Sequence, residues 1–260
     1  MNTRHWSVFT GLCGLAVFAL SAIPSGAQAT EVKEKPPMYS YVSNWQFPRE
    51  RWGDVGKINA ADNTIFQAAL ADGTLVGYGN DANMVHTPDG ESHDTWWSST
   101  SLAGLLKVLD KLRALDNADS PISLSPTKHW DLVLVSHYYN WKPGPYTGAY
   151  VNVMMYQLKA DAPDDAVSTL SKNVVVPLME KLLADGTILE YEVDTEAIHT
   201  DAPGLVAIVY DTPQPEGVDT VRAAIRDSQK NNPLIGPSFD SWIDYSQHRD
   251  ELLKGNGAYK

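Results

Sequence analysis

The chain has 260 residues, with 20 lysine and arginine residues against 32 aspartate and glutamate residues, so its formal net charge is −12. A protein this acidic repels phosphate backbones, which argues against nucleic acid as a partner. It has a single cysteine, which excludes a disulfide within the chain and a metal site built of cysteines alone.

Residues 1–29 are predicted to be a cleavable signal peptide. Arg4 gives a positive start, residues 6–23 form an apolar stretch, and Ala27-Gln28-Ala29 supplies small residues before the cleavage point. A membrane anchor is the alternative, but it needs about 20 apolar residues, and serine, threonine and glycine dilute this stretch. We therefore expect a periplasmic or secreted protein that has lost Cys13 and does not associate with a membrane after cleavage.

After a short linker at 30–36, a first unit is predicted over residues 37–140. A strand-like run at 38–47 precedes a helix whose apolar residues keep helical spacing, namely Val55, Ile58, Ala61, Ile65 and Ala69. Gly73 suits a left-handed helix end. The remaining elements are strands at 74–86 and 95–98, a leucine-rich helix at 102–112 and an apolar strand at 130–138.

A second unit is predicted over residues 149–250, after a linker at 141–148 that contains Pro143-Gly144-Pro145. Its elements repeat the same order, with strands at 149–158, 187–199 and 205–210 and helices at 161–182 and 218–225. Pro177 is expected to kink the first of these helices. Residues 239–253 fit a strand or a helix equally well, and 251–260 are expected to form a tail.

The two units share sequence as well as order. Residues 70–87 recur at 183–200 without a gap, and nine of the 18 positions are identical, including the Asp-Gly-Thr turn and the pair His86 and His199. A repeat of this length indicates a duplicated structural unit.

Strand-helix-strand-strand-helix-strand is the order of the ferredoxin-like unit. Two such units in tandem resemble the dimeric α/β-barrel superfamily, over residues 37 to about 250. The resemblance implies an α+β fold in which two ferredoxin-like βαββαβ units pack sheet to sheet, sometimes fused in one chain. It also implies pockets between sheet and helices or inside the barrel. Members include cofactor-free monooxygenases, lactone isomerases and haem enzymes.

The expected strands are rich in tyrosine and tryptophan, which either fill the space between two sheets or line a cavity for a planar ligand. The candidate ligand-binding residues are these aromatics and the matched histidines: Tyr41, Trp45, Tyr78, His86, Trp97, Tyr156, Tyr191 and His199. His137 and Tyr139 lie near a strand end, where His137 is a candidate general base; a solvent-facing strand end is the alternative.

No metal or cofactor is predicted. His86 and His93 would face each other across a hairpin, but two imidazoles fall short of the three or four ligands of a zinc site. Glu190 and Glu192 share one face of a strand, yet Gly77 and Gly79 occupy the matching positions. The repeat therefore gives no support to a paired-carboxylate site.

Two functions are favoured by the sequence, and a third is more distant. One is a binder of a small apolar or aromatic molecule, which could act as a cofactor-independent monooxygenase or isomerase. The other is a non-catalytic exported scaffold that joins a partner through an open sheet edge. A haem or metal protein is a third. The chain would be a monomer with an internal pseudo-dimer or a larger homo-oligomer.

Overall fold

The computed structural model describes residues 32–260 apart from 116–124, 201–202, 232 and 234. The predicted signal peptide at 1–29 lies outside the described residues. The eight strands described close into one antiparallel barrel in the order β1-β3-β2-β8-β5-β7-β6-β4. The expected face-to-face packing of two sheets is therefore realised as a single ring, in which β2 pairs with β8 and β4 pairs with β6.

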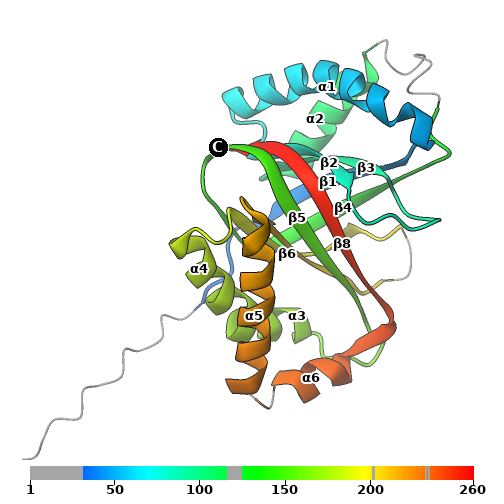
Figure 1. Cartoon of the computed structure of the whole chain (residues 1–260). Coiled ribbons are helices and arrows are strands. Elements are labelled where there is room, and N and C mark those ends of the chain that lie inside the picture. The colour runs from blue at the N-terminus through cyan, green and yellow to red at the C-terminus, as the bar shows by residue number, and fades with distance from the viewer. Residues whose placement is uncertain (1–31, 116–124, 201–202, 232, 234) are drawn as a thin grey trace, which may run out of the picture. The chain divides into compact units, whose positions relative to one another are not determined.

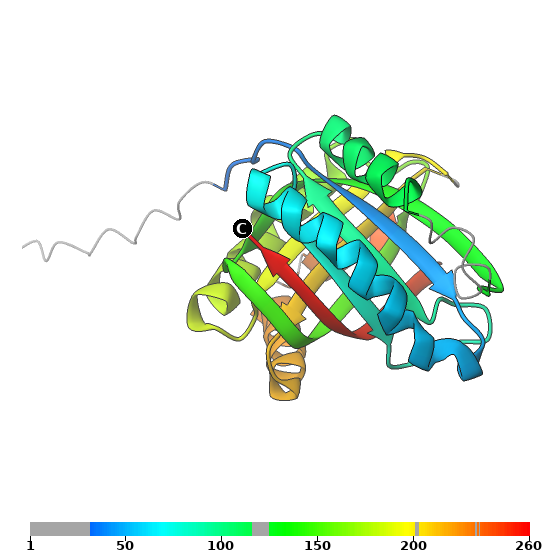
Figure 2. The ribbon, with the colours of Figure 1, turned by 90° about the horizontal axis from the view of Figure 1, so that it is seen from above.

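The first half of the chain supplies one side of the ring. Its elements are β1 (Met38–Gln46), a 3₁₀ turn (Arg49–Arg51), α1 (Trp52–Asp72), β2 (Gly77–Asn83), β3 (His93–Ser99), α2 (Leu102–Arg113) and β4 (Lys128–Trp141). Helices α1 and α2 lie across the outer face of this half of the barrel (Figure 2). Phe66, Ala69 and Leu105 are fully buried between these helices and the strands.

The second half repeats the order with two additions. Its elements are β5 (Gly144–Leu158), α3 (Ala166–Leu170), a π-helical turn η3 (Ser171–Val175), α4 (Val176–Asp185), β6 (Glu190–Ile198), β7 (Leu205–Thr212), α5 (Pro215–Asn231), α6 (Ile235–Trp242) and β8 (Ile243–Tyr259). These helices cover the other side of the barrel (Figure 1). None of the described helices is long and apolar enough to cross a membrane.

The ambiguous segment at 239–253 proves to be both a helix and a strand, because α6 ends at Trp242 and β8 begins at Ile243. β8 then runs to Tyr259, so residues 251–259, expected as a tail, pair with β2 and β5 instead. The expected linker at 141–148 shortens to two residues, since β4 ends at Trp141 and β5 begins at Gly144.

The helix ends that the repeat predicted are equivalent in the two halves. Gly73 and Gly186 take left-handed φ angles of 81° and 85°, which glycine adopts without steric cost. In each half the aspartate before that glycine accepts a hydrogen bond from the next threonine N–H, at 2.8 Å for Asp72 and 3.0 Å for Asp185. The helix is also interrupted near Pro177, as expected, because the π turn at Ser171–Val175 directly precedes α4, in which Pro177 is the second residue.

Closing the ring has a consequence for function. A sheet edge is a template for pairing with another chain, but each of the eight described strands has a neighbour on both sides. The open edge that the scaffold hypothesis required is therefore absent from the described part of the chain.

Candidate functional site

The outer face of the first half-sheet holds a cavity of about 240 Å³ beneath α1 and α2. Alternate residues of each strand point to this face. β1 contributes Tyr41, Ser43 and Trp45, β3 contributes His93, Thr95 and Trp97, and β4 contributes His129 and Asp131.

The strand register arranges these side chains in rows across three neighbouring strands. Trp45 on the central strand β1 pairs with His93 on one side and with His129 on the other. Tyr41, four residues away, pairs with Trp97. The cavity wall therefore has two rows of rings. In one row the indole of Trp45 lies between the imidazoles of His93 and His129, and in the other the ring of Tyr41 lies beside that of Trp97.

The aromatic rings form flat surfaces. Tyr41 stacks on Trp97 with ring centroids 4.4 Å apart, and Trp45 stacks on His129 at 3.7 Å. Trp97 is 2% exposed, and its indole N–H donates to the carbonyl oxygen of Leu105 in α2 at 3.3 Å. This bond fixes the ring that forms the floor, because a buried indole N–H needs a partner.

Helix α1 closes the cavity with polar residues inside its apolar stripe. Val55, Ile58, Asn59 and Asp62 line the cavity from one face of the helix, as the i, i+3, i+4, i+7 spacing requires. The stripe is apolar again at Phe66, which packs on Trp97 with centroids 5.5 Å apart. Asn59 and Asp62 thus add polar groups to the side of the cavity that α1 closes.

His93 is held as a neutral base. Burial, and secondly the nearby His86, lower the pKa of His93, so that the ring is uncharged at neutral pH. Its Nδ1 lies 3.0 Å from the Ser92 hydroxyl. That hydroxyl donates to the carbonyl oxygen of Trp45 at 3.2 Å, so it can only accept from His93. The Nδ1 atom therefore has the proton, and Nε2 is the basic nitrogen.

A second histidine lies at the cavity mouth. The His129 side chain is 37% exposed. Its Nδ1 donates to the carbonyl oxygen of Asn44 at 3.0 Å, and its Nε2 lies 3.5 Å from a carboxyl oxygen of Asp131. Burial and a hydrogen bond to Asp131 raise the pKa of the Tyr41 hydroxyl. Asp131 thus lies between the tyrosine hydroxyl and the imidazole.

The second half of the chain has no matching polar cavity among its described residues. The equivalent space beneath α3 to α6 measures about 100 Å³ and is lined mainly by apolar side chains such as Met154, Leu178 and Ile208. Val206 is buried in that core. His248 stacks on Tyr156 and lies 3.5 Å from Asp250, as His129 does with Trp45 and Asp131, but it does not line this space. Val206 takes the place of His93, so the cavity with a buried strand histidine belongs to the first half.

The structure brings three of the predicted ligand-binding residues, Tyr41, Trp45 and Trp97, into this cavity. The others lie apart. Tyr78 packs on Phe66 in the first core with centroids 5.4 Å apart, and Tyr191 is 1% exposed and donates to Glu180 at 2.7 Å. Tyr156 lines the smaller apolar space beneath α3 to α6.

The predicted histidines are scattered as well. His86 lies in the exposed loop after β2, with its ring 4.6 Å from that of Trp52, and His199 is exposed after β6. His137 and Tyr139 contact the N-terminal segment, through hydrogen bonds to the carbonyl oxygens of Lys35 at 3.2 Å and Pro36 at 2.9 Å. Among the residues described, no group of three or more histidine, cysteine, aspartate or glutamate side chains could hold a metal ion.

Sequence reasoning missed His129, Asp131, Asn59 and Asp62, and it considered His93 only as half of a metal pair. A signal was present for some of them. His129 and Asp131 alternate along one strand, and Asn59 and Asp62 lie one helical turn apart, so both pairs share a face. Which of the two faces would be enclosed was not readable from the pattern.

No protein-family model and no curated protein matches this sequence. Solved structures do. A proposed monooxygenase from Lactobacillus acidophilus NCFM aligns with a TM-score of 0.60 at 12% identity, over 86% of this chain and 97% of that one. A proposed monooxygenase from Fusobacterium nucleatum aligns with a TM-score of 0.58 at 7% identity, over 87% and 95%. An anthrone oxidase-like protein aligns with a TM-score of 0.50 at 8% identity, over 85% and 92%.

These likenesses, together with the closed eight-stranded ring, show the fold of the dimeric α/β-barrel superfamily, as the element order had indicated. At such identities they establish the fold alone.

Proposed function

We propose that the cavity beneath α1 and α2 binds a planar, largely apolar aromatic molecule and removes a proton from it, so that the resulting carbanion reacts directly with O₂. The observation that supports this best is the row His93-Trp45-His129, which sets a neutral imidazole beside a flat aromatic surface in an enclosed space. Stacking binds the ligand, and a base with a pKa near or below neutral accepts its proton.

The chemistry needs no cofactor if the substrate can stabilise negative charge. A methylene group between two aromatic rings and opposite a carbonyl loses a proton to His93 Nε2. The carbanion adds O₂ to give a peroxide, which releases water and leaves a ketone. One oxygen atom enters the product and the other leaves as water. Two of the similar structures are proposed monooxygenases and one is anthrone oxidase-like, which fits this reaction class.

The proposal extends to architecture and compartment. We infer that each half is a ferredoxin-like repeat, since both show the strand neighbours 4-1-3-2 within the half. One chain then closes the barrel that two subunits close elsewhere in the superfamily, which supports a functional monomer.

We also infer export after cleavage behind Ala29, which N-terminal sequencing of the protein from the native host would test.

The experiment is oxidation of anthrone in air-saturated buffer, measured as formation of the quinone above the rate in buffer alone. His93→Gln is expected to lower the rate about 100-fold or more, because general-base catalysis contributes at least that much. His199→Gln, an exposed histidine outside the cavity, is the matched control and should leave the rate unchanged. Wild-type turnover in His93→Gln would overturn the assignment of the base.

Binding is measured separately, so that a wrong reaction is distinguished from a wrong site. Quenching of tryptophan fluorescence by anthraquinone, which cannot lose the proton, gives the affinity. Trp45→Ala should weaken this affinity by about tenfold, the loss expected for one stacked ring. An unchanged affinity would show that the ligand does not lie against Trp45.

A further inference from the structure

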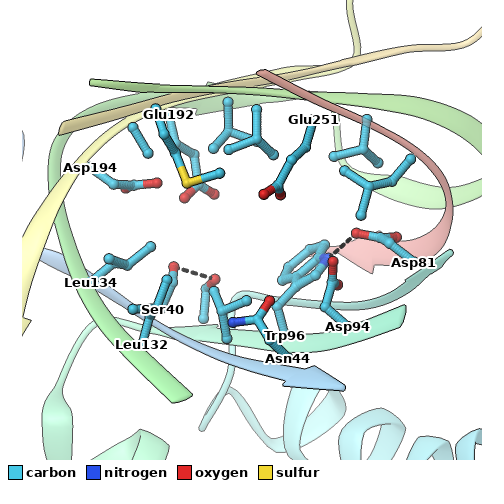
Figure 3. Close-up of a pocket in the computed structure, with 18 of the residues that line it drawn as sticks. Ser40, Asn44, Asp81, Asp94, Trp96, Leu132, Leu134, Glu192, Asp194 and Glu251 are labelled. Carbon is cyan, nitrogen blue, oxygen red and sulfur yellow. Dashed lines mark hydrogen bonds between the residues drawn. The ribbon is translucent and has the colours of Figure 1, made fainter. Parts of the chain in front are cut away.

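The inner face of the same barrel encloses a second cavity, unrelated to the one beneath the helices. Eight carboxyl side chains line it: Asp81, Glu91, Asp94, Glu190, Glu192, Asp194, Asp211 and Glu251. Several of them point into the central space in Figure 3. Among the described residues, Arg249 is the one basic side chain in the lining, and its side chain is 58% exposed. The interior therefore holds far more potential negative charge than positive charge.

The carboxyl groups stand on two facing walls. In the ring of eight strands, β2 lies opposite β6. The first wall consists of Asp81 on β2, Asp94 on its neighbour β3 and Glu251 on its other neighbour β8. The second wall consists of residues on β6 and β7, namely Glu190, Glu192, Asp194 and Asp211.

Apolar side chains lie between these walls on two sides of the ring, and Tyr259 of β8 reaches across to Glu190 and Glu192 of β6. β5 contributes Val151 and Val153 to the lining from one side. On the opposite side of the ring, β1 contributes Val42 and its neighbour β4 contributes Leu132 and Leu134. Figure 3 shows Leu132 and Leu134 on the side of Asp194, with Trp96 and Asn44 nearer to Asp94. A molecule that spans the cavity would meet acid at both ends and, along its length, mainly apolar side chains together with Ser40, Asn44 and Ser98.

Part of the acidic lining already has partners. Tyr259 donates its hydroxyl proton toward Glu192 at 2.8 Å, with Glu190 at 3.2 Å, and Trp96 donates to Asp81 at 3.0 Å. Three carboxyl oxygens do not: one oxygen each of Asp94, Asp194 and Asp211 has no hydrogen-bond partner among the described residues. These residues are 8%, 2% and 4% exposed. Buried polar atoms are nearly always paired, so an unpaired set around one cavity indicates a missing partner.

The raised pKa values of the buried carboxyl groups also indicate a missing partner. Burial raises the pKa of Asp81 and of Glu192 to about 7 and that of Glu251 to about 8. Burial, together with the neighbouring carboxyls, also raises the pKa of Asp94 and Asp211. So many carboxylates cannot all be ionised in a space of low polarity. Either protons or a bound cation must neutralise them.

We propose that the barrel interior binds an aliphatic diammonium ion, with one ammonium group at each acidic wall and the methylene chain against the valine and leucine side chains. An ammonium group donates three hydrogen bonds and accepts none, which suits unpaired carboxyl oxygens. A bare metal ion is a poorer fit, because the described carboxyl groups face one another across the cavity and no three converge on one point.

The test is isothermal titration calorimetry of the chain that begins at Thr30, dialysed at pH 7.5, with 1,4-diaminobutane as the probe. We expect saturable binding of one diamine per chain, at least tenfold tighter than that of butylamine, which has a single ammonium group. The heat should vary with the ionisation enthalpy of the buffer, because the carboxyl groups release protons when the diamine enters. No saturable binding, equal affinity for butylamine, or tighter binding of Ca²⁺ than of the diamine would overturn the proposal.

Two amide variants remove charge at nearly constant shape. Asp211→Asn and Glu192→Gln should each weaken diamine binding by tenfold or more and raise the Tm of the ligand-free protein. A merely structural role would lower the Tm instead. Asp250→Asn is the matched control, since Asp250 lies next to Glu251 on β8 but its side chain is 52% exposed. Unchanged affinity in both amide variants would refute the site.

Discussion

The buried carboxyl groups predict that the ligand-free protein is less stable at pH 8 than at pH 5. Their pKa values are raised in the folded state, so the folded protein binds protons more tightly than the unfolded chain does. The stability from these protons is fully present below the unfolded value of about 4. It is lost as the pH rises through about 7 for Asp81 and Glu192 and about 8 for Glu251.

The size of the effect follows from one group. Moving the pKa of Asp81 from 3.8 to about 7 corresponds to about 4 kcal/mol if this carboxyl titrates alone. That is a large fraction of the ~5–15 kcal/mol by which proteins are stable, so the shifts of the coupled carboxyls cannot simply add. The unfolded carboxyl is already ionised at pH 5, so about 3 kcal/mol of this loss falls between pH 5 and pH 8. That would lower the Tm by about 6–12 °C in a protein of this size.

The assay is urea unfolding followed by tryptophan fluorescence at several pH values between 5 and 8. Asp94→Asn is the informative variant, because Asp81, Glu91 and Glu251 are the charged groups that act on Asp94. Removing its charge should flatten the decline in unfolding free energy, whereas Asp250→Asn should leave it unchanged. His93, whose lowered pKa acts in the opposite direction below about pH 6.5, is common to all three proteins. Constant or rising wild-type stability across this range would refute the reasoning.

Two further predictions concern glycines. Gly79→Ala would put a methyl carbon 2.5 Å from the Trp96 indole. It should therefore destabilise the protein by about 1–3 kcal/mol and shift the fluorescence of Trp96. An unchanged unfolding curve would contradict the close packing. Gly73→Ala and Gly186→Ala should each cost about 1–2 kcal/mol, because both glycines have left-handed φ angles; clearly unequal losses in urea unfolding would argue against equivalent helix ends.

Much of the fold could be predicted from the sequence. Hydrophobic periodicity located the helices, and the repeated Asp-Gly-Thr turn located the left-handed helix ends at Gly73 and Gly186. Element order led to the superfamily. Residues 239–253 could not be assigned, because Trp242 and Tyr245 fit both periods. Pairing with β5 and β2 decides that Ile243 onward is a strand, and pairing is a long-range contact.

The candidate site was predicted less well. The aromatic content of the strands pointed to Tyr41, Trp45 and Trp97, which do meet in one cavity. The histidines were chosen because they matched between repeats at a fixed sequence offset, yet the cavity uses His93, which Val206 replaces in the second half, and His129, whose structural counterpart His248 lies at a different offset. When one copy of a duplicated fold has a functional site, the two copies are expected to differ at that site. A search for matched residues therefore misses the site residues.

Glu190 and Glu192 were set aside for the same reason, although Asp81 and Asp194, which also line the barrel, do match between the repeats. Gly77 and Gly79 occupy the positions of Glu190 and Glu192, and the structure shows why: a side chain there would collide with Tyr259 and Trp96, which fill the barrel from this side. Acidic residues within strands were visible in the sequence, and strands ordinarily disfavour them.

The sequence by itself determined the local structure and the duplication, because helix periodicity, capping and turn chemistry depend on neighbours within a few residues. Only the tertiary structure decided which face of each strand is enclosed by helices and which by the other strands of the ring. The alternation of side chains along a strand gives a sheet two faces, but it does not show which face the helices will cover. Closure of β2 on β8 and of β4 on β6 gives each face its surroundings, and with them its burial, its charge and its chemistry.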